Sequence, residues 1–228
     1  MSSTKIEFAV QMTCGSCVAA VKKSLENVPG INDVVVDLEK NSVIVDSSLS
    51  TLEVQKKLEE SGRKVAVRGF GGSVAGVSIL ESGEKDAKGV VRFIQATERA
   101  YIIDGTVDGL LPGGYEVSIH ECGDISQGCQ SVGDVYSPNN VDHPDYGKIG
   151  TVTAGQDGRA TFRLENNVIK LSDIIGRSFV ISQVSKEPKR VACGVVARSS
   201  GLFENPKTIC ACDGVTIWSE KIPPKSTL

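Results

Sequence analysis

The hydrophobic pattern of this 228-residue chain changes at the glycine-dense stretch GFGGS of residues 69–73. Before this stretch, apolar residues recur at both strand and helix spacing. After it they form short strand-like runs, separated by turn residues, up to about residue 199. A glycine-dense stretch between two differently patterned segments is typical of a linker. We therefore predict an α+β domain at residues 1–68 and an all-β domain at residues 74–199, joined by this linker.

The first domain begins with one strand and one helix. Strand-like alternation covers residues 6–10, and helical spacing follows until Pro29 and Gly30 end it. β-branched runs at residues 31–38 and 42–46 then flank a turn, which predicts a hairpin.

A second helix and a last strand complete the domain. Ser50 and Glu53 have the spacing of a capping box, so a helix is expected from there to about Gly62. Val65 and Val67 alternate as in a final strand. The resulting β-α-β-β-α-β order is the split unit of a ferredoxin-like domain.

Charge and apolar content exclude several classes of protein. The net charge is −3, and no long run of one sign suggests nucleic-acid or membrane-surface binding. Glu7 and Gln11 interrupt the apolar residues near the N-terminus, so a signal peptide is not expected. No run approaches the roughly 20 apolar residues of a membrane span. We therefore expect a cytoplasmic protein, whose seven cysteines indicate metal or redox chemistry.

Cys14 and Cys17 fall between the first strand and the first helix, where the helix N-terminus favours thiolates. Two soft thiolates without a nearby histidine suit Cu(I) better than Zn(II), which takes four ligands. The alternatives are a thioredoxin-like redox pair or two incidental cysteines. Arg63 and Lys64 can offset the charge of a copper bis-thiolate if their loop lies beside it.

The sequence MTCGSC at residues 12–17 carries the first resemblance. Within a β-α-β-β-α-β unit, it resembles the M-x-C-x-x-C motif of the heavy-metal-associated domain. The resemblance covers residues 5–68 and implies copper binding by the two cysteines.

The all-β segment resembles copper–zinc superoxide dismutase. The stretches that carry this resemblance are GVVRF at 89–93, IHECGD at 119–124, IIGRS at 174–178 and RVACGVV at 190–196. The resemblance implies an eight-stranded Greek-key barrel. It also implies a disulfide between Cys129 and Cys193, with Arg190 close by.

The metal ligands of that enzyme family are missing. A dismutase uses six histidines and one aspartate, whereas this chain has two histidines, His120 and His143. Two further positions that hold metal ligands in that family, a histidine and the zinc aspartate, correspond to residues near Val135 and Lys148 of this chain. We interpret both histidines as ordinary polar residues, so bound zinc is not expected and the chain is not predicted to be an enzyme.

A barrel that keeps an enzyme's surface without its site is predicted to be a docking module. The dismutase interface is self-complementary, so the barrel is expected to form a homodimer at rest and a heterodimer with copper–zinc superoxide dismutase. Cys122 fits neither cysteine pair and is predicted to be a buried free thiol.

The polar segment of residues 200–228 is predicted to be a mobile tail. Cys210 and Cys212 lie two residues apart, so in an extended segment both thiols face one side and can meet one soft ion. A disulfide across so small a loop would be strained and readily exchanged. Such a pair can therefore hold copper or donate oxidation.

The order of metal-binding domain, dismutase-like domain and C-x-C tail resembles the copper chaperone for superoxide dismutase family. The resemblance implies that Cys14 and Cys17 acquire Cu(I), and that Cys210 and Cys212 deliver it to immature dismutase and promote its disulfide. One alternative is a superoxide dismutase with an appended copper-binding domain. Another is a copper buffer or thiol oxidoreductase that acts on many proteins.

Overall fold

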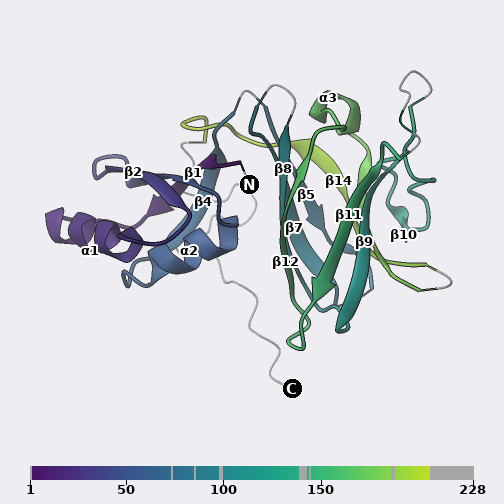
Figure 1. The fold of residues 1–228 in the computed structure, drawn as a ribbon, viewed down its shortest axis with the longest axis horizontal. Coiled ribbons are helices and arrows are strands. Elements are labelled where there is room, and N and C mark those ends of the chain that lie inside the picture. Colours follow the sequence, from purple (N-terminus) through teal and green to yellow (C-terminus); the bar gives the residue numbers. More distant parts are fainter. Residues whose placement is uncertain are drawn as a thin grey trace.

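Two structural units lie side by side in the molecule, a small α+β unit and a β-barrel (Figure 1). The computed structural model describes residues 2–72, 74–84, 86–97, 100–138, 143, 145–185 and 188–205. Both fold classes predicted from the sequence are confirmed. Among the described helices, none has both the length and the apolar character needed to cross a bilayer.

The first unit is a four-stranded antiparallel sheet with two helices packed against one face. Its elements are β1 (Thr4–Val10), α1 (Gly15–Leu25), β2 (Ile31–Asp37), β3 (Ser42–Ser47), α2 (Thr51–Glu59) and β4 (Val65–Phe70). The strands lie in the order β2-β3-β1-β4, with the predicted hairpin between β2 and β3. Ile6, Phe8 and Val10 of β1 are completely buried in a core that also receives helical side chains.

Local features of the chain fix the end of α1 and the start of α2. α1 ends at Leu25, before the predicted stop at Pro29, because the C-cap residue Glu26 is extended, and Asn27 after it is left-handed with φ of 56°. α2 begins with the predicted capping box. Ser50 N donates to Glu53 Oε2 at 2.9 Å, and Glu53 N donates to Ser50 Oγ at 3.3 Å.

The second unit is a nearly closed antiparallel barrel. Its longer strands are β5 (Ala75–Leu80), β7 (Lys88–Gln95), β8 (Tyr101–Asp108), β9 (Gly113–His120), β11 (Lys148–Ala154), β12 (Ala160–Asn166), β13 (Ser178–Gln183) and β14 (Lys189–Arg198). They follow the order β11-β9-β13-β14-β5-β7-β8-β12. Shorter elements are β6 (Ser82–Gly83), β10 (Ser126–Cys129) and α3 (Leu171–Ile174). Phe93 and Phe179 meet edge to face in the core.

The boundary between the units differs from the predicted linker at residues 69–73. β4 continues to Phe70, so the first two residues of that stretch belong to the sheet. A Cβ atom at Gly69 would lie 2.3 Å from the carbonyl oxygen of Gly201. This glycine therefore permits a close backbone approach, a requirement that a sequence pattern does not distinguish from flexibility.

A buried polar cluster joins the two units. Asp104 on β8 accepts a hydrogen bond from Thr51 N, in the first turn of α2, at 2.9 Å. The same carboxylate accepts from Arg163 Nη1 at 3.3 Å, and Arg163 Nη2 donates to Thr4 Oγ1 at 2.9 Å. Burial raises the pKa of Asp104, and hydrogen bonding and the arginine charge oppose that rise. Ile102 of the barrel also packs into the core of the first unit, so the units share apolar as well as polar contacts.

Candidate metal site and the other cysteines

The loop between β1 and α1 brings two thiols together. Cys14 is the N-cap of α1, with an extended φ of −161°, and Cys17 lies in the first helical turn. Their sulfur atoms are 3.6 Å apart. Cys14 is exposed, whereas Cys17 is only 1% exposed and belongs to the core. The pair therefore has one accessible sulfur and one fixed by packing.

Hydrogen bonds stabilise the thiolate form of both cysteines. The Ser16 hydroxyl, 2.9 Å from Cys14 Sγ, is the main cause that lowers the pKa of Cys14 to about 6, and the backbone N–H of Cys17 contributes next. The pKa of Cys17 is lowered chiefly by the backbone N–H of Thr13, at 3.5 Å, and by its hydroxyl. The thiolate of Cys14 is therefore its main form at neutral pH, ready for a soft metal ion.

Met12, the first residue of the M-x-C-x-x-C motif, and Asn41, which the sequence analysis did not single out, hold this loop. Met12 is 4% exposed and packs in the same core as Cys17, so its side chain anchors the loop to the core of the first unit. Its backbone N–H donates to Asn41 Oδ1 at 2.8 Å, and Val10 N donates to the Asn41 carbonyl at 2.9 Å. Asn41 makes both contacts from a left-handed conformation, φ 51°, in the β2–β3 turn. The sequence showed an asparagine in a hairpin turn, but it did not show that this asparagine would contact Met12.

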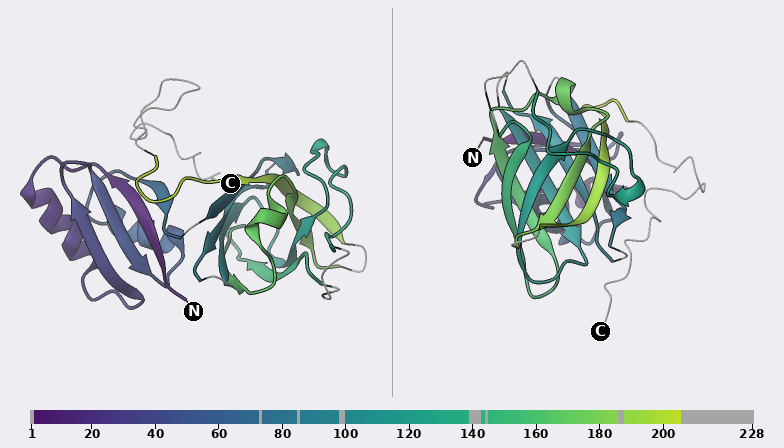
Figure 2. Two further views of the ribbon diagram at one scale, coloured as in Figure 1. Left: turned by 90° about the horizontal axis from the view of Figure 1, so that it is seen from above. Right: turned by 90° about the vertical axis from the view of Figure 1, so that its right-hand side faces the viewer.

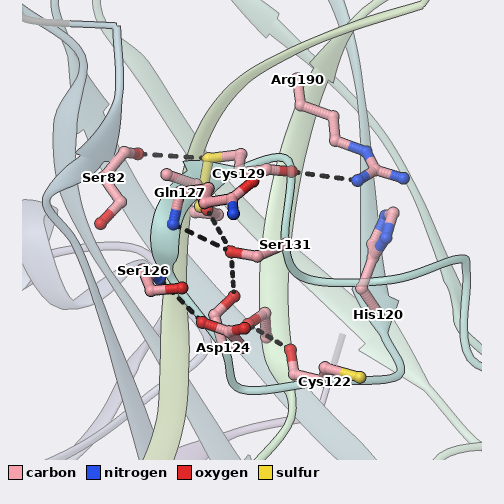
Figure 3. Close-up of a disulfide and its surroundings, with 12 residues drawn as sticks. Ser82, His120, Cys122, Asp124, Ser126, Gln127, Cys129, Ser131 and Arg190 are labelled. Carbon is pink, nitrogen blue, oxygen red and sulfur yellow. Dashed lines mark hydrogen bonds between the residues drawn. A yellow bond between two sulfur atoms is a disulfide. The ribbon is translucent and has the colours of Figure 1, made fainter.

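The second cysteine pair of the described chain forms a disulfide (Figure 3). Cys129 of β10 is bonded to Cys193 of β14, with Cα atoms 5.7 Å apart and both residues buried. Arg190 Nη1 donates to the Cys129 carbonyl at 3.0 Å. The pairing and the nearby arginine that the dismutase resemblance implied are both present.

His120 has protein partners at both ring nitrogens. Nδ1 lies 2.9 Å from the Gly133 carbonyl and Nε2 lies 3.1 Å from Ser118 Oγ. Burial lowers the pKa of His120. Val135 faces it in an isolated β-bridge, and Lys148 forms an ion pair with Asp145 on the surface. The residues at these two former ligand positions are therefore not metal donors.

Metal-ligating side chains do not gather elsewhere in the described part of the chain, where no group of three or more His, Cys, Asp and Glu residues is placed to hold an ion. The sulfur pair of Cys14 and Cys17 is the arrangement there that suits a soft ion of low coordination number. Cys210 and Cys212 lie outside the described residues.

Cys122 corrects a prediction. It was expected to be buried, but it is exposed. Its backbone is fixed on both sides, because Cys122 N donates to the Val132 carbonyl at 2.9 Å and the Cys122 carbonyl accepts from Ser178 Oγ at 2.7 Å. The backbone of Cys122 makes both of these hydrogen bonds, and its thiol points away from the disulfide (Figure 3).

Comparison with known proteins places both units in described families. The heavy-metal-associated domain matches residues 7–64, and copper/zinc superoxide dismutase matches residues 87–196. The chain is 42% identical to the copper chaperone for superoxide dismutase of Sus scrofa, over 96% of this chain and 89% of that protein. Identity to the Homo sapiens protein of the same name is also 42%, over 95% and 88%. The superoxide dismutase 1 copper chaperone of Debaryomyces hansenii is 34% identical, over 96% and 95%.

Proposed function

The chain belongs to the copper chaperones for superoxide dismutase, and from that premise we propose that Cys14 and Cys17 carry Cu(I) as cargo for that enzyme. The observation that supports this most is the pair of sulfur atoms 3.6 Å apart, both with lowered pKa values. Cu(I) accepts two soft ligands, whereas zinc takes four. Zinc therefore has no part in this proposal.

Cys14 is the sulfur that an incoming thiolate displaces first. It is exposed, whereas Cys17 is held in the core, so exchange begins at Cys14 and Cys17 retains the ion until a second incoming thiolate replaces it. The Ser16 hydroxyl stabilises the Cys14 thiolate when it is released. The backbone carbonyl of Lys64 accepts a hydrogen bond from Gln11 N at 3.0 Å, so its segment runs beside the start of the loop. We propose that Lys64 and Arg63 offset the charge of the copper bis-thiolate.

The barrel serves as the docking module. It retains the dismutase scaffold, including the disulfide of Cys129 and Cys193, while His120 is fully engaged by protein groups. A surface of this kind can pair with a second copy at rest and with immature copper–zinc superoxide dismutase during delivery. The chain is a chaperone rather than a dismutase, and we infer that it acts in the cytoplasm.

Cys210 and Cys212 deliver copper and promote the target disulfide. A target thiolate attacks one sulfur of an oxidised Cys210–Cys212 bond and forms a mixed disulfide. The second target thiolate then attacks the target's own sulfur in that bond and releases the tail as a dithiol. Two electrons pass from the target to the tail, and the target's two thiol protons go to the released tail thiolates. Dioxygen restores the tail disulfide: it takes up the two electrons and two protons of the tail dithiol and is reduced to hydrogen peroxide.

Native mass spectrometry with copper-free, reduced, zinc-loaded dismutase tests this proposal. We expect a heterodimer of one chaperone and one dismutase subunit, and copper on the dismutase subunit after incubation with Cu(I)-loaded chaperone. Cys14→Ser with Cys17→Ser should lower the copper transferred when copper is limiting but leave the heterodimer intact. Cys122→Ser is the matched control and should change neither. A general copper buffer would transfer copper to unrelated apo-proteins equally well, and that result would refute the proposal.

A further inference from the structure

Glu7 is buried at a position where strand alternation predicts exposure. Ile6 and Phe8 point into the helix-covered core, so Glu7 points to the opposite face of the sheet, which neither α1 nor α2 covers. Glu7 is nevertheless only 1% exposed. Carboxylates are rarely buried to this extent without partners, so something specific must cover and satisfy it.

The partners of Glu7 come from two distant parts of the chain. Oε1 accepts a hydrogen bond from Ser42 Oγ at 2.8 Å and lies 3.5 Å from Arg68 Nη1. Oε2 accepts from the backbone N–H of Phe203 at 2.7 Å, across a separation of 196 residues. The metal-binding domain thus satisfies one oxygen itself and offers the other to the segment that follows the barrel.

Residues 200–204, here called the anchor segment, lie along the edge strand β4. Phe70 N donates to the Ser200 carbonyl at 3.4 Å, and Phe70 pairs with Gly201 in a parallel bridge. Gly69 leaves room for the Gly201 carbonyl. Figure 2 shows the yellow end of the described chain crossing from the barrel to the first unit. The predicted mobile tail therefore begins with residues that are docked.

The conformation of Phe203 also indicates a built contact. Its φ of 63° is left-handed, which is uncommon for a phenylalanine. Phe203 as a whole residue is 60% exposed, and Lys40 Nζ lies 5.6 Å from the centroid of its ring, so burial does not explain the conformation. What the conformation achieves is a backbone N–H directed at Glu7.

We propose that Glu7 holds the anchor segment on the metal-binding domain and thereby limits the reach of Cys210 and Cys212. Cys210 follows Phe203 by seven positions, so it can lie at most about 25 Å from Phe203. Cys14 follows Glu7 by seven positions and is subject to the same limit. Because Glu7 and Phe203 are in contact, the docked anchor segment lets the tail thiols meet the metal site of their own first domain.

Release of the anchor segment lengthens this reach. The chain is then fixed only up to Ser199, whose backbone N–H donates to the Ala75 carbonyl at 2.9 Å. Cys210 is eleven positions beyond Ser199, so it can extend up to about 40 Å from the barrel. The docked state therefore favours the chain's own Cys14 and Cys17, and the released state favours a partner bound to the barrel. This functional consequence rests on the proposed role of the tail cysteines in delivery, whereas the docking does not.

Gly69→Ala tests the docking from the side of the sheet. The three atoms nearest to the added Cβ all belong to Ser200 and Gly201, so the variant should displace the anchor segment without disturbing the core. In the full-length, copper-free protein, we expect hydrogen exchange of the Phe203 amide to be at least tenfold faster in the variant. Gly114→Ala is the control, because its Cβ would meet only Val184 at an ordinary 3.7 Å. Equal exchange rates in wild type and Gly69→Ala would overturn the proposal.

Phe203→Pro tests the docking from the side of the anchor segment. Proline removes the donor N–H and cannot adopt a φ of 63°. Phe203→Asn also removes the ring but keeps the N–H and tolerates the left-handed region, so it is the matched control. We expect exchange of the Phe70 amide to accelerate in the proline variant and not in the asparagine variant. The same acceleration in both would show that the ring, and not the hydrogen bond to Glu7, holds the segment.

Cysteine cross-linking with a short bismaleimide tests the limit on reach. In dilute reduced protein, we expect cross-links from Cys14 or Cys17 to Cys210 or Cys212 to form at least about twofold more slowly in Gly69→Ala than in wild type. Unchanged cross-linking together with faster amide exchange would refute the limit on reach. Neither readout uses copper or dismutase, so a failure of copper delivery would leave this inference standing.

Discussion

The two cysteine pairs in the described chain differ in their chemical state: one pair consists of free thiols and the other forms a disulfide. Cys14 and Cys17 lie at a helix N-terminus, with one sulfur exposed and both pKa values lowered. Cys129 and Cys193 are buried and joined to each other. The helix start supplies N–H and hydroxyl donors that favour thiolates, whereas β10 and β14 hold two sulfurs within bonding distance. Backbone setting therefore decides which pair remains as free thiols with lowered pKa values and which pair forms a disulfide.

Loss of the first pair should have the largest effect, on copper affinity. In a chain that also carries Cys210→Ser and Cys212→Ser, we expect Cys14→Ser with Cys17→Ser to weaken Cu(I) binding more than about 100-fold, since both ligands are removed. Anaerobic competition with a chromophoric Cu(I) chelator measures this. The chain with only the two tail substitutions is the control, and an unchanged affinity in the fourfold variant would assign copper to other residues.

Loss of the second pair should change stability and not copper binding. The disulfide spans 64 positions, so Cys129→Ala with Cys193→Ala should lower the free energy of unfolding by about 4 kcal/mol. Urea unfolding followed by circular dichroism measures the difference. Cys122→Ala, which removes an exposed thiol, should change stability by less than about 0.5 kcal/mol. A weaker Cu(I) site in the disulfide variant would contradict the division between the two pairs.

The contact between the two regions can be tested with two aspartates on the same strand. Asp104→Ala leaves Arg163 buried without its carboxylate and should lower the free energy of unfolding by about 3 kcal/mol. Asp108→Ala removes the exposed partner of Arg159 and should cost less than about 1 kcal/mol. Exchange of the Thr51 amide should accelerate only in the first variant. Equal effects of both substitutions would show that the buried cluster does not join the units.

The smallest effect concerns the reactivity of Cys14. Its pKa of about 6 means that the thiolate is present above pH 6 and is lost as the pH falls through 6. Alkylation of apo-protein by iodoacetamide should therefore slow about tenfold between pH 7 and pH 5, against about 100-fold for an ordinary thiol. Ser16→Ala should move the midpoint upward, and Ser24→Ala, which loses only a bond to the Val21 carbonyl, should not. A 100-fold change in wild type would rule out the lowered pKa.

Local patterns predicted much of the fold. Alternation identified β1, β-branched runs identified the hairpin of β2 and β3, and the spacing of Ser50 and Glu53 identified the start of α2. These features depend on residues close together in the sequence, where propensity and capping act directly. The position of Cys14 and Cys17 between β1 and α1 followed from the same patterns.

Contacts between residues that are distant in the sequence could not be predicted from local patterns. The bond from Thr51 to Asp104 spans 53 positions, and the one from Phe203 to Glu7 spans 196. Each depends on how the two units dock, which periodicity does not encode. The exposure of Cys122 was also missed, because its backbone is oriented by hydrogen bonds to Val132, in the turn after β10, and to Ser178 of β13.

Activation of copper-free dismutase is the most direct test of the claim that copper chemistry belongs to the cysteine pairs and docking to the barrel. Cu(I)-loaded chain is mixed with reduced, zinc-loaded, copper-free dismutase under oxygen, and superoxide dismutation is followed. We predict strong activation by wild type, none by Cys210→Ser with Cys212→Ser, and partial activation by Cys14→Ser with Cys17→Ser when copper is plentiful. Robust dismutation by the Cu(I)-loaded chain alone, without added dismutase, would contradict the claim.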